Sequence, residues 1–276
     1  MAVLRSPEAL TTSPELLPDD FQRVRRIAYE RAGLAIPNGK EGLVRSRVST
    51  RLREERLPTF RAYLDAVEAD PNSVEMITLI DLLTTNKTDF FREPAHFDFL
   101  LSQIVPPVVA SARPLRIWSA GCSTGEEAYT LAMVLHDALP PRYDLRILAT
   151  DISTRVVATA KAGTYTAQQL GGLSLPCRQR WFTPTADDGA SVNSELRDTI
   201  GFANLNLMAS WPMSGPFDVI FCRNVMIYFD KPTVTRLVDR FHKLIAPGGH
   251  LFIGHSESLT AIDHMYRYVQ PAVYVK

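Results

Sequence analysis

The stretch Leu115–Leu131 constrains the fold of this 276-residue chain more than any other. Its first part, Leu115–Ser119, is short and rich in β-favouring residues, which predicts a buried strand. Gly121 and Gly125 follow, and glycine lets the backbone turn sharply and approach a ligand because no Cβ stands in the way. A helix is predicted from Glu126 on, since carboxylates are favoured in a first helical turn. The pattern indicates a strand, a glycine turn suited to a ligand, and a helix.

A second buried strand is predicted at Arg146–Thr150, and Asp151 follows at its carboxyl end. Open α/β sheets place ligand contacts at the carboxyl ends of their strands, where a carboxylate accepts hydrogen bonds from both hydroxyls of a ribose. The glycine turn lacks the G-x-G-x-x-G spacing of dinucleotide-binding enzymes. These features favour the shorter cofactor S-adenosyl-L-methionine (SAM), and a plain strand-to-helix turn is the structural alternative.

The segment Gly121–Gly125 also fits G-x-S-x-G, the nucleophile elbow of serine hydrolases. Ser123 would be the nucleophile, and Asp218 and His255 are the downstream candidates for a triad. The elbow requires a strand upstream for its oxyanion hole, but the upstream segment has helical spacing. A serine hydrolase is therefore the disfavoured alternative.

Composition excludes several other classes. The formal net charge is zero and 46% of the residues are hydrophobic, so nothing global indicates a nucleic-acid or membrane partner. The N-terminus lacks the apolar stretch of a secretion signal and no run reaches membrane-spanning length, so we expect a cytoplasmic protein without membrane insertion. Three cysteines and six histidines form neither C-x-x-C nor H-E-x-x-H, and no metal site is predicted.

Helical spacing from Phe21 to Leu83, broken at Pro37–Gly39, Pro58 and Pro71, predicts four helices, the first capped by Asp19 or Asp20. The expected domains are a flexible arm at 1–18, a basic helical domain at 19–83, a linker and cofactor-contacting segment at 84–114, and a SAM-binding domain at 115–276 with a β-subdomain inserted at about 163–202.

Further elements complete an α/β, doubly wound sheet of the SAM-dependent methyltransferase kind with an antiparallel last strand. The expected elements are a helix at His96–Val105 that stops at Pro106–Pro107, a helix at Thr154–Ala162, a helix near Ser174–Trp181 followed by a hairpin around Asp188–Gly189, a strand of the main sheet at Gly201–Asn206, a strand at Pro216–Cys222, a helix capped by Asp230 that runs through Ile245 and is stopped by Pro247–Gly249, a strand at His250–Gly254, and a closing antiparallel pair at Tyr266–Val269 and Ala272–Val275.

Polar groups follow three strands that would lie side by side. They are the glycine turn, Asp151, and Arg223 with Asn224. The connector before the first strand is also polar: Asn86 and Thr88 precede an arginine, Arg92, whose guanidinium can fork onto a carboxylate. This convergence predicts a single cofactor site, and the alternative for the connector is a simple domain linker.

The N-terminal domain is locally basic, with eleven basic against four acidic residues between Phe21 and Tyr63. In the helix predicted at Leu43–Arg56, Val44, Val48 and Leu52 face the core, which leaves arginines on both flanks. One flank carries Arg45, Arg53 and Arg56, and the other carries Arg47 and Arg51. A solvated face is the simple interpretation and an acidic partner is the functional one. Nucleic acid is disfavoured because few aromatic residues are available to stack on bases.

With these motifs in this order, the chain resembles the chemotaxis receptor-glutamate O-methyltransferase family, CheR. The resemblance extends from about Leu17 to the end of the chain. It is carried by Thr85–Arg92, Trp118–Glu127, Thr150–Ile152, Asn206–Leu207, Phe217–Asp230 and Gly254–Glu257.

The resemblance implies an enzyme that methylates glutamate side chains of methyl-accepting chemotaxis receptors and releases S-adenosyl-L-homocysteine. It implies that Arg92 and Tyr228 line the methyl-transfer site, and that the receptor's helical bundle meets Arg45, Arg47, Arg51 and Arg53. The implied cofactor contacts are Asn86, Thr88, Arg92, Glu127, Asp151, Asn206, Leu207, Arg223 and Asn224. The alternatives are a non-catalytic SAM-sensing or receptor-binding module and a nucleic-acid methyltransferase.

The chemistry agrees with these residue types. A glutamate carboxyl has a pKa of about 4.3, so it is ionised at neutral pH and needs no general base. Positioning must supply most of the rate enhancement, and we assign orientation to Arg92 and Tyr228.

The sequence of the inserted subdomain bears on how the enzyme binds its receptor. Some members of the family grip a C-terminal receptor pentapeptide by strand addition to this subdomain. Here the segment after Trp181–Phe182 is about three residues shorter than in such members, and Asp187 and Asp188 replace a G-x-G. A shorter loop shifts the hairpin register, and two aspartates repel an acidic tail. We expect no pentapeptide binding, and we expect a monomer.

Overall fold

The computed structural model describes residues 14–70 and 73–276 and separates into two compact units. The first unit extends to Leu83, except that Ala32–Leu34 belongs to the second unit together with Thr84–Lys276. Most of the expected arm at 1–18, and Pro71, lie outside the described residues.

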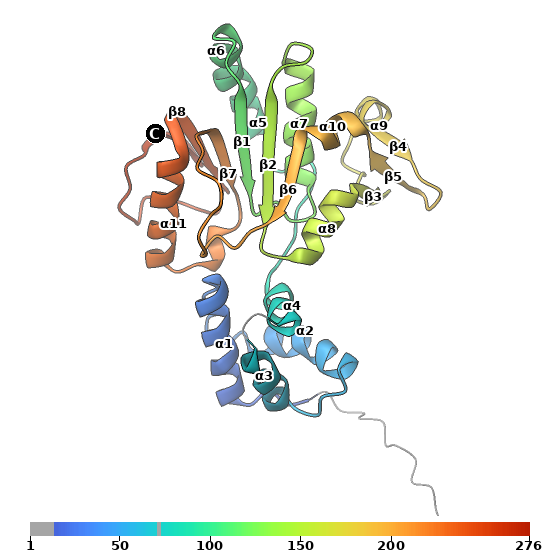
Figure 1. Ribbon diagram of the computed structural model, residues 1–276, viewed down its shortest axis with the longest axis vertical. Coiled ribbons are helices and arrows are strands. Elements are labelled where there is room, and N and C mark those ends of the chain that lie inside the picture. Colours follow the sequence, from blue (N-terminus) through green and yellow to red (C-terminus); the bar gives the residue numbers. More distant parts are fainter. Residues whose placement is uncertain (1–13, 71–72) are drawn as a thin grey trace, which may run out of the picture. The chain divides into compact units, whose positions relative to one another are not determined.

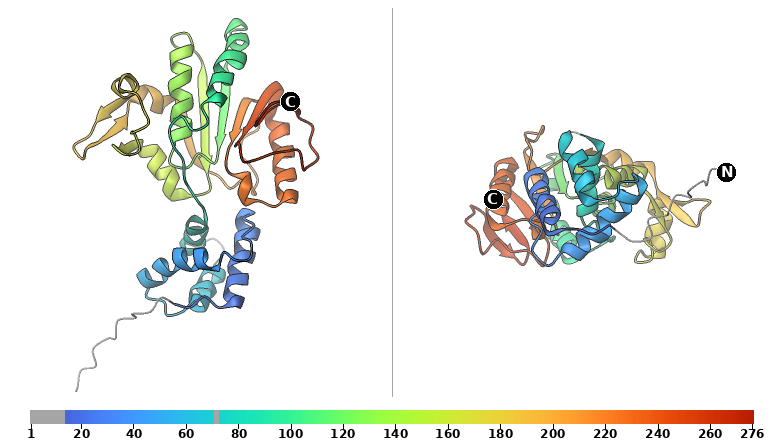
Figure 2. Two further views of the ribbon diagram at one scale, coloured as in Figure 1. Left: turned by 180° about the vertical axis from the view of Figure 1, so that it is seen from behind. Right: turned by 90° about the horizontal axis from the view of Figure 1, so that it is seen from below.

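The first unit consists of the four expected helices (Figures 1 and 2): α1 (Pro18–Ala32), α2 (Glu41–Glu54), α3 (Phe60–Ala69) and α4 (Val74–Leu83). The predicted apolar stripe of α2 is fully buried at Val44, Val48 and Leu52. The predicted cap is wrong, because α1 already begins at Pro18 and both aspartates lie in its first turn. Proline suits this position since the first N–H groups of a helix have no partner within the helix.

The second unit contains a seven-stranded sheet in the order β6-β2-β1-β7-β8-β10-β9 (Figure 1). Pairing is parallel from β6 to β8, and β10 is antiparallel to both β8 and β9, which confirms the predicted fold class. The strands are β1 (Leu115–Ala120), β2 (Leu145–Asp151), β6 (Ile200–Asn204), β7 (Phe217–Cys222), β8 (Ile245–Ile253), β9 (Arg267–Gln270) and β10 (Val273–Val275).

Apolar residues on both faces of the sheet explain why helices cover both of them. Successive side chains of a strand point to opposite faces. Ile117 accordingly packs in one core cluster with Leu131 of α7 (Glu126–Ala138), and its neighbour Trp118 packs in another with Phe241 of α11 (Lys231–Leu244). Two further helices of this unit are α8 (Thr154–Ala162), which agrees with its predicted bounds, and α10 (Ser194–Thr199).

The helical segment before β1 is longer than predicted. It runs through α5 (Ala95–Phe99), a π-helical turn η1 (Leu100–Ile104) and α6 (Val105–Ala110). Pro106 and Pro107 do not end it, because they lie in the first turn of α6, where no N–H is required. In the preceding π-helical turn, the Val105 N–H donates to the Leu100 carbonyl, five residues back along the chain instead of the four of an α-helix.

The inserted subdomain is a small antiparallel sheet that lies beyond the β6 edge of the main sheet (Figure 2). The predicted hairpin forms between β4 (Phe182–Pro184) and β5 (Gly189–Val192), preceded by α9 (Leu175–Trp181). A third strand, β3 (Thr164–Thr166), pairs with β5 and was not predicted. The insertion ends before Ile200, earlier than expected, because β6 already belongs to the main sheet.

The end of α11 also differs from the prediction. The helix ends at Leu244, and β8 begins at Ile245 instead of His250. Pro247–Gly249 therefore lies within β8, where the register with β7 shifts between Phe217 and Val219. The glycines fit such a bulge, since a Cβ on Gly249 would approach the Asp218 carbonyl oxygen to 2.7 Å.

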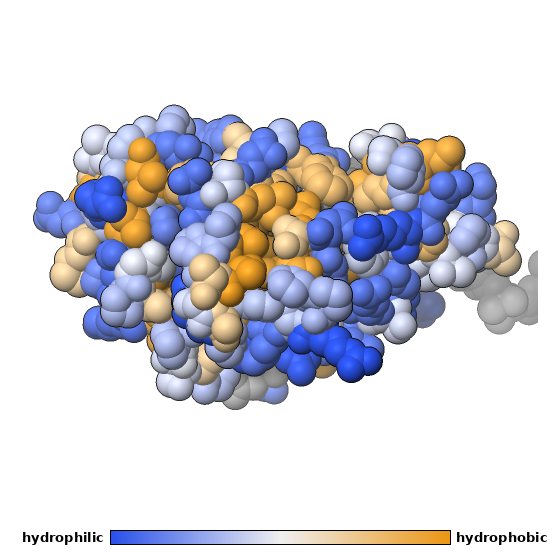
Figure 3. Space-filling model, turned by 90° about the horizontal axis from the view of Figure 1, so that it is seen from above, coloured by the Kyte–Doolittle hydropathy of each residue, from blue (hydrophilic) through white to orange (hydrophobic). Residues whose placement is uncertain are grey.

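The surface mixes apolar and hydrophilic areas. Figure 3 shows apolar side chains gathered near the centre of the face seen from above, with hydrophilic ones around them. Within residues 14–70 and 73–276, no helix has both the length and the apolar character needed to cross a membrane.

Candidate functional site

The glycine turn is folded against the end of β2. The N–H groups of Gly121 and Cys122 both donate to the Thr150 carbonyl, at 2.8 and 2.9 Å. Gly121 has a φ of 90°, and a Cβ there would come within 2.3 Å of the Val225 side chain, so only glycine fits. Asp151 is buried and accepts from the Ser123 N–H at 2.9 Å. The carboxylate at the end of β2 therefore fixes the turn as well as facing the site.

A buried arginine connects three segments of the site. The side chain of Arg223, at the end of β7, is 2% exposed, and its Nη1 lies 3.6 Å from Glu127 Oε2. Its Nη2 lies 3.4 Å from Glu93 Oε2 and donates to the Arg92 carbonyl at 2.5 Å. Burial raises the pKa of Glu127, and Arg223 and a hydrogen bond from Ser119 act against this rise. Arg223 Nε is buried and has no hydrogen-bond partner among the described residues.

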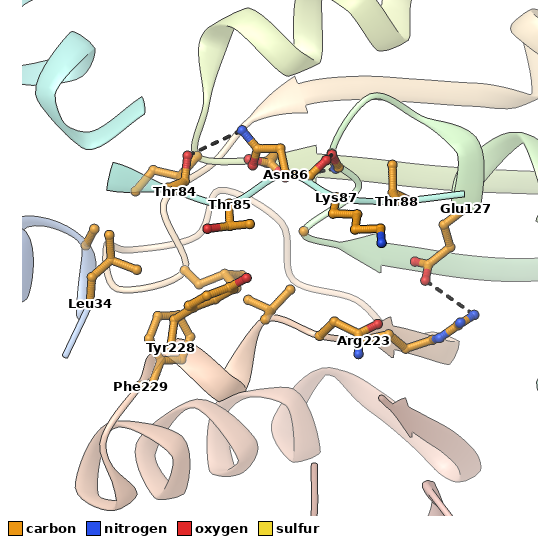
Figure 4. A pocket seen from close by; sticks show the side chains of 18 of the residues that line it. Leu34, Thr84, Thr85, Asn86, Lys87, Thr88, Glu127, Arg223, Tyr228 and Phe229 are labelled. Atoms are coloured by element: carbon orange, nitrogen blue, oxygen red, sulfur yellow. Dashed lines mark hydrogen bonds and ion pairs between the residues drawn. The ribbon is translucent and has the colours of Figure 1, made fainter. Parts of the chain in front are cut away.

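All ten residues predicted from the sequence to contact the cofactor or to act in catalysis line one pocket in the second unit. Its volume is about 970 Å³, including space open to solvent. In Figure 4 the segment Thr84–Thr88 runs along one side, and Tyr228 faces it from the other. The ten are Asn86, Thr88, Arg92, Glu127, Asp151, Asn206, Leu207, Arg223, Asn224 and Tyr228.

Several lining residues were not predicted. Three of them directly follow or precede a predicted residue in the sequence: Lys87, Ile152 and Phe229. Their proximity to predicted residues could have indicated that they line the pocket. Ala32 is the last residue of α1, and Leu34 follows this helix. Neither had such a signal, because three further helices separate them from the other lining residues along the chain.

The Asn206–Leu207 segment is held from outside the pocket. Arg240 of α11 donates to the carbonyls of Leu207 and Ala209, each at 2.5 Å, and its guanidinium carbon lies 3.7 Å from the centre of the Trp211 ring. The Asn206 side chain accepts from the Met208 N–H at 2.9 Å. These bonds fix the backbone at the carboxyl side of β6.

The serine-hydrolase alternative is incompatible with the geometry. Ser123 donates its hydroxyl hydrogen to the Asn86 carbonyl at 2.9 Å, so the hydroxyl serves to attach the connector to the turn. Asp218 lies near the amino end of β7, where it is paired with Arg113 and accepts from the Arg116 N–H at 2.8 Å. Since Arg116 and Ser123 are at opposite ends of β1, Asp218 cannot complete a triad with Ser123.

Three possible metal ligands meet beside the pocket. Ligand atoms of Glu93, His96 and His255 lie within 4.8 Å of one another. His96 is fully buried, and neither of its ring nitrogens has a hydrogen-bond partner in the described part of the chain. However, the Arg223 guanidinium lies 3.4 Å from Glu93 Oε2 and already places a positive charge against that oxygen. A metal cation there would be opposed by a like charge, so we derive no metal chemistry from this cluster.

His96 makes a pH-dependent contribution to stability. Burial and the neighbouring Arg223 lower its pKa to about 4, although Glu93 acts in the opposite direction. The unfolded chain, with a histidine pKa of about 6.5, binds one more proton than the folded chain between these two values. We expect the free energy of unfolding to fall by up to about 3 kcal/mol as pH decreases through this range.

Urea unfolding at several pH values measures this slope. The control is His96→Gln, which cannot titrate and is expected to show a flatter profile between about pH 6.5 and 4. Identical slopes in the two proteins would contradict the assignment.

The four arginines predicted to meet a receptor differ in their surroundings. Arg45 and Arg53 are exposed on α2. Arg47 donates to the Leu83 carbonyl at 2.8 Å, and Arg51 forms ion pairs with Glu54, Glu55 and Glu75. Arg47 and Arg51 are thus largely engaged within the first unit, which favours Arg45 and Arg53 as partner contacts.

The doubly wound sheet, with its glycine turn, an acid after β2 and a pocket at the strand ends, defines the class of SAM-dependent methyltransferases. Within this class the chain belongs to the CheR methyltransferase family. Residues 86–275 match the model of the CheR methyltransferase SAM binding domain, and residues 19–84 match that of the CheR methyltransferase all-alpha domain.

Curated relatives agree along most of the chain. Chemotaxis protein methyltransferase 2 of Pseudomonas aeruginosa is 42% identical over 93% of this chain and 92% of its own length. The chemotaxis protein methyltransferase of Escherichia coli is 39% identical over 92% of this chain and 89% of its own. A solved S-adenosylmethionine-dependent methyltransferase from Mesorhizobium loti is 19% identical, covering 55% of this chain and 54% of that one at a TM-score of 0.31, a similarity too low to add to the assignment.

Proposed function

We propose that this protein transfers a methyl group from SAM to glutamate carboxylates of methyl-accepting chemotaxis receptors in the cytoplasm, giving glutamyl methyl esters and S-adenosyl-L-homocysteine. The observation that carries the proposal is the pocket, where Asp151, the Glu127–Arg223 pair and the side chains of Arg92 and Tyr228 meet. Membership of the CheR family supports the same reaction.

The pocket residues fit the chemistry of SAM. The Asp151 carboxylate suits the two ribose hydroxyls, which are hydrogen-bond donors. At the methionine end, the Glu127 carboxylate suits the ammonium group and the guanidinium of Arg223 suits the carboxylate. Leu207 is an apolar neighbour for the adenine. When bound, SAM supplies an electrophilic methyl group on a sulfonium.

The protein's own contribution is positioning. The receptor glutamate is ionised at neutral pH, so no side chain of the pocket has to remove a proton. Arg92 presents a guanidinium that can hold the incoming carboxylate and balance its charge. Tyr228, which faces the segment Thr84–Thr88 across the pocket (Figure 4), offers a hydroxyl that can orient it. Both contacts must remain moderate, because a carboxylate bound too tightly is a weaker nucleophile.

The direct test is transfer of a tritiated methyl group from SAM to receptor cytoplasmic fragments, with RNA and DNA as alternative acceptors. We expect labelling of receptor glutamates only. Labelled nucleic acid would favour the nucleic-acid methyltransferase, and SAM binding without any labelling would favour a non-catalytic module.

Receptor binding is proposed to involve the exposed arginines of α2. Reversing both charges in Arg45→Glu/Arg53→Glu is expected to raise KM for receptor roughly tenfold at low salt, since each exposed charge contact contributes up to about 1 kcal/mol. SAM affinity should be unchanged. Wild-type KM should itself rise with salt, because attraction between surface charges is screened over about 8 Å at physiological ionic strength.

The matched control is Lys161→Glu/Lys243→Glu, which reverses two exposed charges on α8 and α11. An equal increase of KM in both double variants would indicate a general charge effect and would contradict a specific role of α2. Reversing Arg47 or Arg51 is a poorer test, because either change breaks contacts within the first unit.

We also propose that the enzyme acts as a monomer without the pentapeptide tether. The loop between β4 and β5 carries Asp187 and Asp188, both exposed, and they oppose an acidic peptide. Isothermal titration with a receptor C-terminal pentapeptide is expected to give no measurable heat of binding. The free edges of this small sheet belong to β3 and β4, because β5 pairs with both of them. Low-micromolar binding that is lost in a variant of one of these edge strands would overturn the proposal. Trp181 is unsuitable for such a variant because it is buried in the core.

A further inference from the structure

We propose that the turn Gly254–Glu257, at the end of β8, fixes the positions of Arg92 and Tyr228 relative to one another. The inference rests on the proposed function, which makes these two side chains catalytic. The turn has no direct contact with the cofactor site, since none of its four residues lines the pocket.

Glu257 holds the segment that carries Tyr228. Its Oε2 accepts from the N–H groups of Asn224 and Gly254, at 2.9 and 2.5 Å, and its Oε1 accepts from the Ile227 N–H at 3.2 Å. Tyr228 is the last residue of the short 3₁₀ helix η2 (Met226–Tyr228). A carboxylate at the start of a helical turn satisfies N–H groups that have no partner within the turn. Glu257 therefore caps the turn from which Tyr228 extends.

The approach of the two segments requires a glycine. A Cβ on Gly254 would lie 2.9 Å from the backbone nitrogen of Asn224 and 2.5 Å from its side-chain nitrogen. Asn224 itself has a φ of 60°, a left-handed conformation that costs free energy unless surrounding contacts impose it. The hydrogen bond from its N–H to Glu257 is one such contact.

The next residue of the motif holds the segment that carries Arg92. The His255 N–H donates to Glu93 Oε1 at 3.3 Å. The other oxygen of Glu93 lies 3.4 Å from Arg223, which donates to the Arg92 carbonyl. Phe91 and Glu93, on either side of Arg92, both have positive φ angles, of 55° and 56°. This turn is strained and therefore depends on contacts from outside it.

Two carboxylates thus bind adjacent N–H groups of one turn. Glu257 accepts from Gly254 and holds the Tyr228 segment, while Glu93 accepts from His255 and holds the Arg92 segment. Because the turn continues a strand of the central sheet, it provides a rigid reference for both. Glu257 is a positioning residue that acts through Tyr228 and does not line the pocket.

The test compares Glu257→Gln with a matched control, Asp218→Asn. Asp218 likewise accepts a backbone N–H, that of Arg116, but it is buried near the amino end of β7, away from the pocket, whereas Glu257 is partly buried. In the wild type, three N–H groups bind the two carboxylate oxygens of Glu257. Glutamine offers them only one acceptor oxygen. We expect Glu257→Gln to lower kcat about tenfold with a smaller change in KM for SAM, and Asp218→Asn to leave kcat near the wild-type value at comparable loss of stability.

A double-mutant cycle distinguishes positioning from general destabilisation. If Glu257 acts through Tyr228, then Glu257→Gln should slow the Tyr228→Phe enzyme much less than it slows the wild type. Equal slowing in both backgrounds, or an equal loss in Asp218→Asn, would overturn the proposal.

A second readout does not depend on activity. Amide hydrogen exchange at Asn224 and Ile227 should become about tenfold faster in Glu257→Gln and should not change in Asp218→Asn. Unchanged exchange would overturn the proposed cap even if the enzyme were active. Faster exchange in a protein without methyl transfer would retain the cap and count against the proposed function instead.

Discussion

Replacing Arg92 with alanine is expected to slow methyl transfer to receptor fragments by about 100-fold at saturating SAM, a loss comparable to removing one positioned donor from an active site. Arg92 lines the pocket, and within residues 14–70 and 73–276 its guanidinium makes only one hydrogen bond, to the Lys87 carbonyl at 3.1 Å. It is therefore placed to bind the incoming carboxylate. The measurement is single-turnover transfer of a tritiated methyl group.

Two further variants make this result specific. Tyr228→Phe keeps the ring and removes the hydroxyl, so we expect a smaller decrease, of about tenfold. Ser123→Ala removes a hydrogen bond to the Asn86 carbonyl and should change the rate least of the three. An Arg92→Ala enzyme with wild-type turnover would contradict the assigned role, and esterase activity that is lost in Ser123→Ala would restore the hydrolase alternative.

Replacing Asp151 with alanine is expected to weaken SAM binding by about 2–4 kcal/mol, or roughly 30- to 1,000-fold in Kd. The carboxylate is proposed to accept from the ribose, and it also accepts from the N–H groups of Ser123 and Ser153, at 2.9 and 3.0 Å. Alanine therefore removes the ligand contact and leaves two N–H groups of the site unsatisfied. Titration calorimetry with S-adenosyl-L-homocysteine measures the change in Kd.

Asp151→Asn separates these two effects. The amide keeps the shape and one acceptor oxygen but loses the charge, so we expect an intermediate affinity. Thermal unfolding followed by circular dichroism should show that both variants remain folded. Unchanged affinity in Asp151→Ala would remove Asp151 from the cofactor site.

Much of the architecture follows from local sequence pattern. The buried stripe of α2 was predicted from its spacing, and α8 has its predicted bounds. The convergence of the glycine turn, Asp151 and Arg223 was predictable because β1, β2 and β7 are parallel and adjacent, so their carboxyl ends share one edge. Regular spacing and chain direction are local properties, and they were sufficient to bring together the residues of the pocket.

Tertiary structure decided what spacing does not encode. Arg47 and Arg51 appear as surface charges on a helical wheel, but Leu83 and Glu75, far along the chain, engage them. Strand β3 has only three residues, too few to show a period, and it is held by its pairing with β5. In the same way, the local sequence around Glu257 does not indicate its partners. The turn after β8 places its carboxylate against the N–H groups of Asn224 and Ile227. The sequence by itself determined the elements and the class of site, whereas only the fold decided these partners, because such contacts join residues whose separation along the chain leaves no periodic signal.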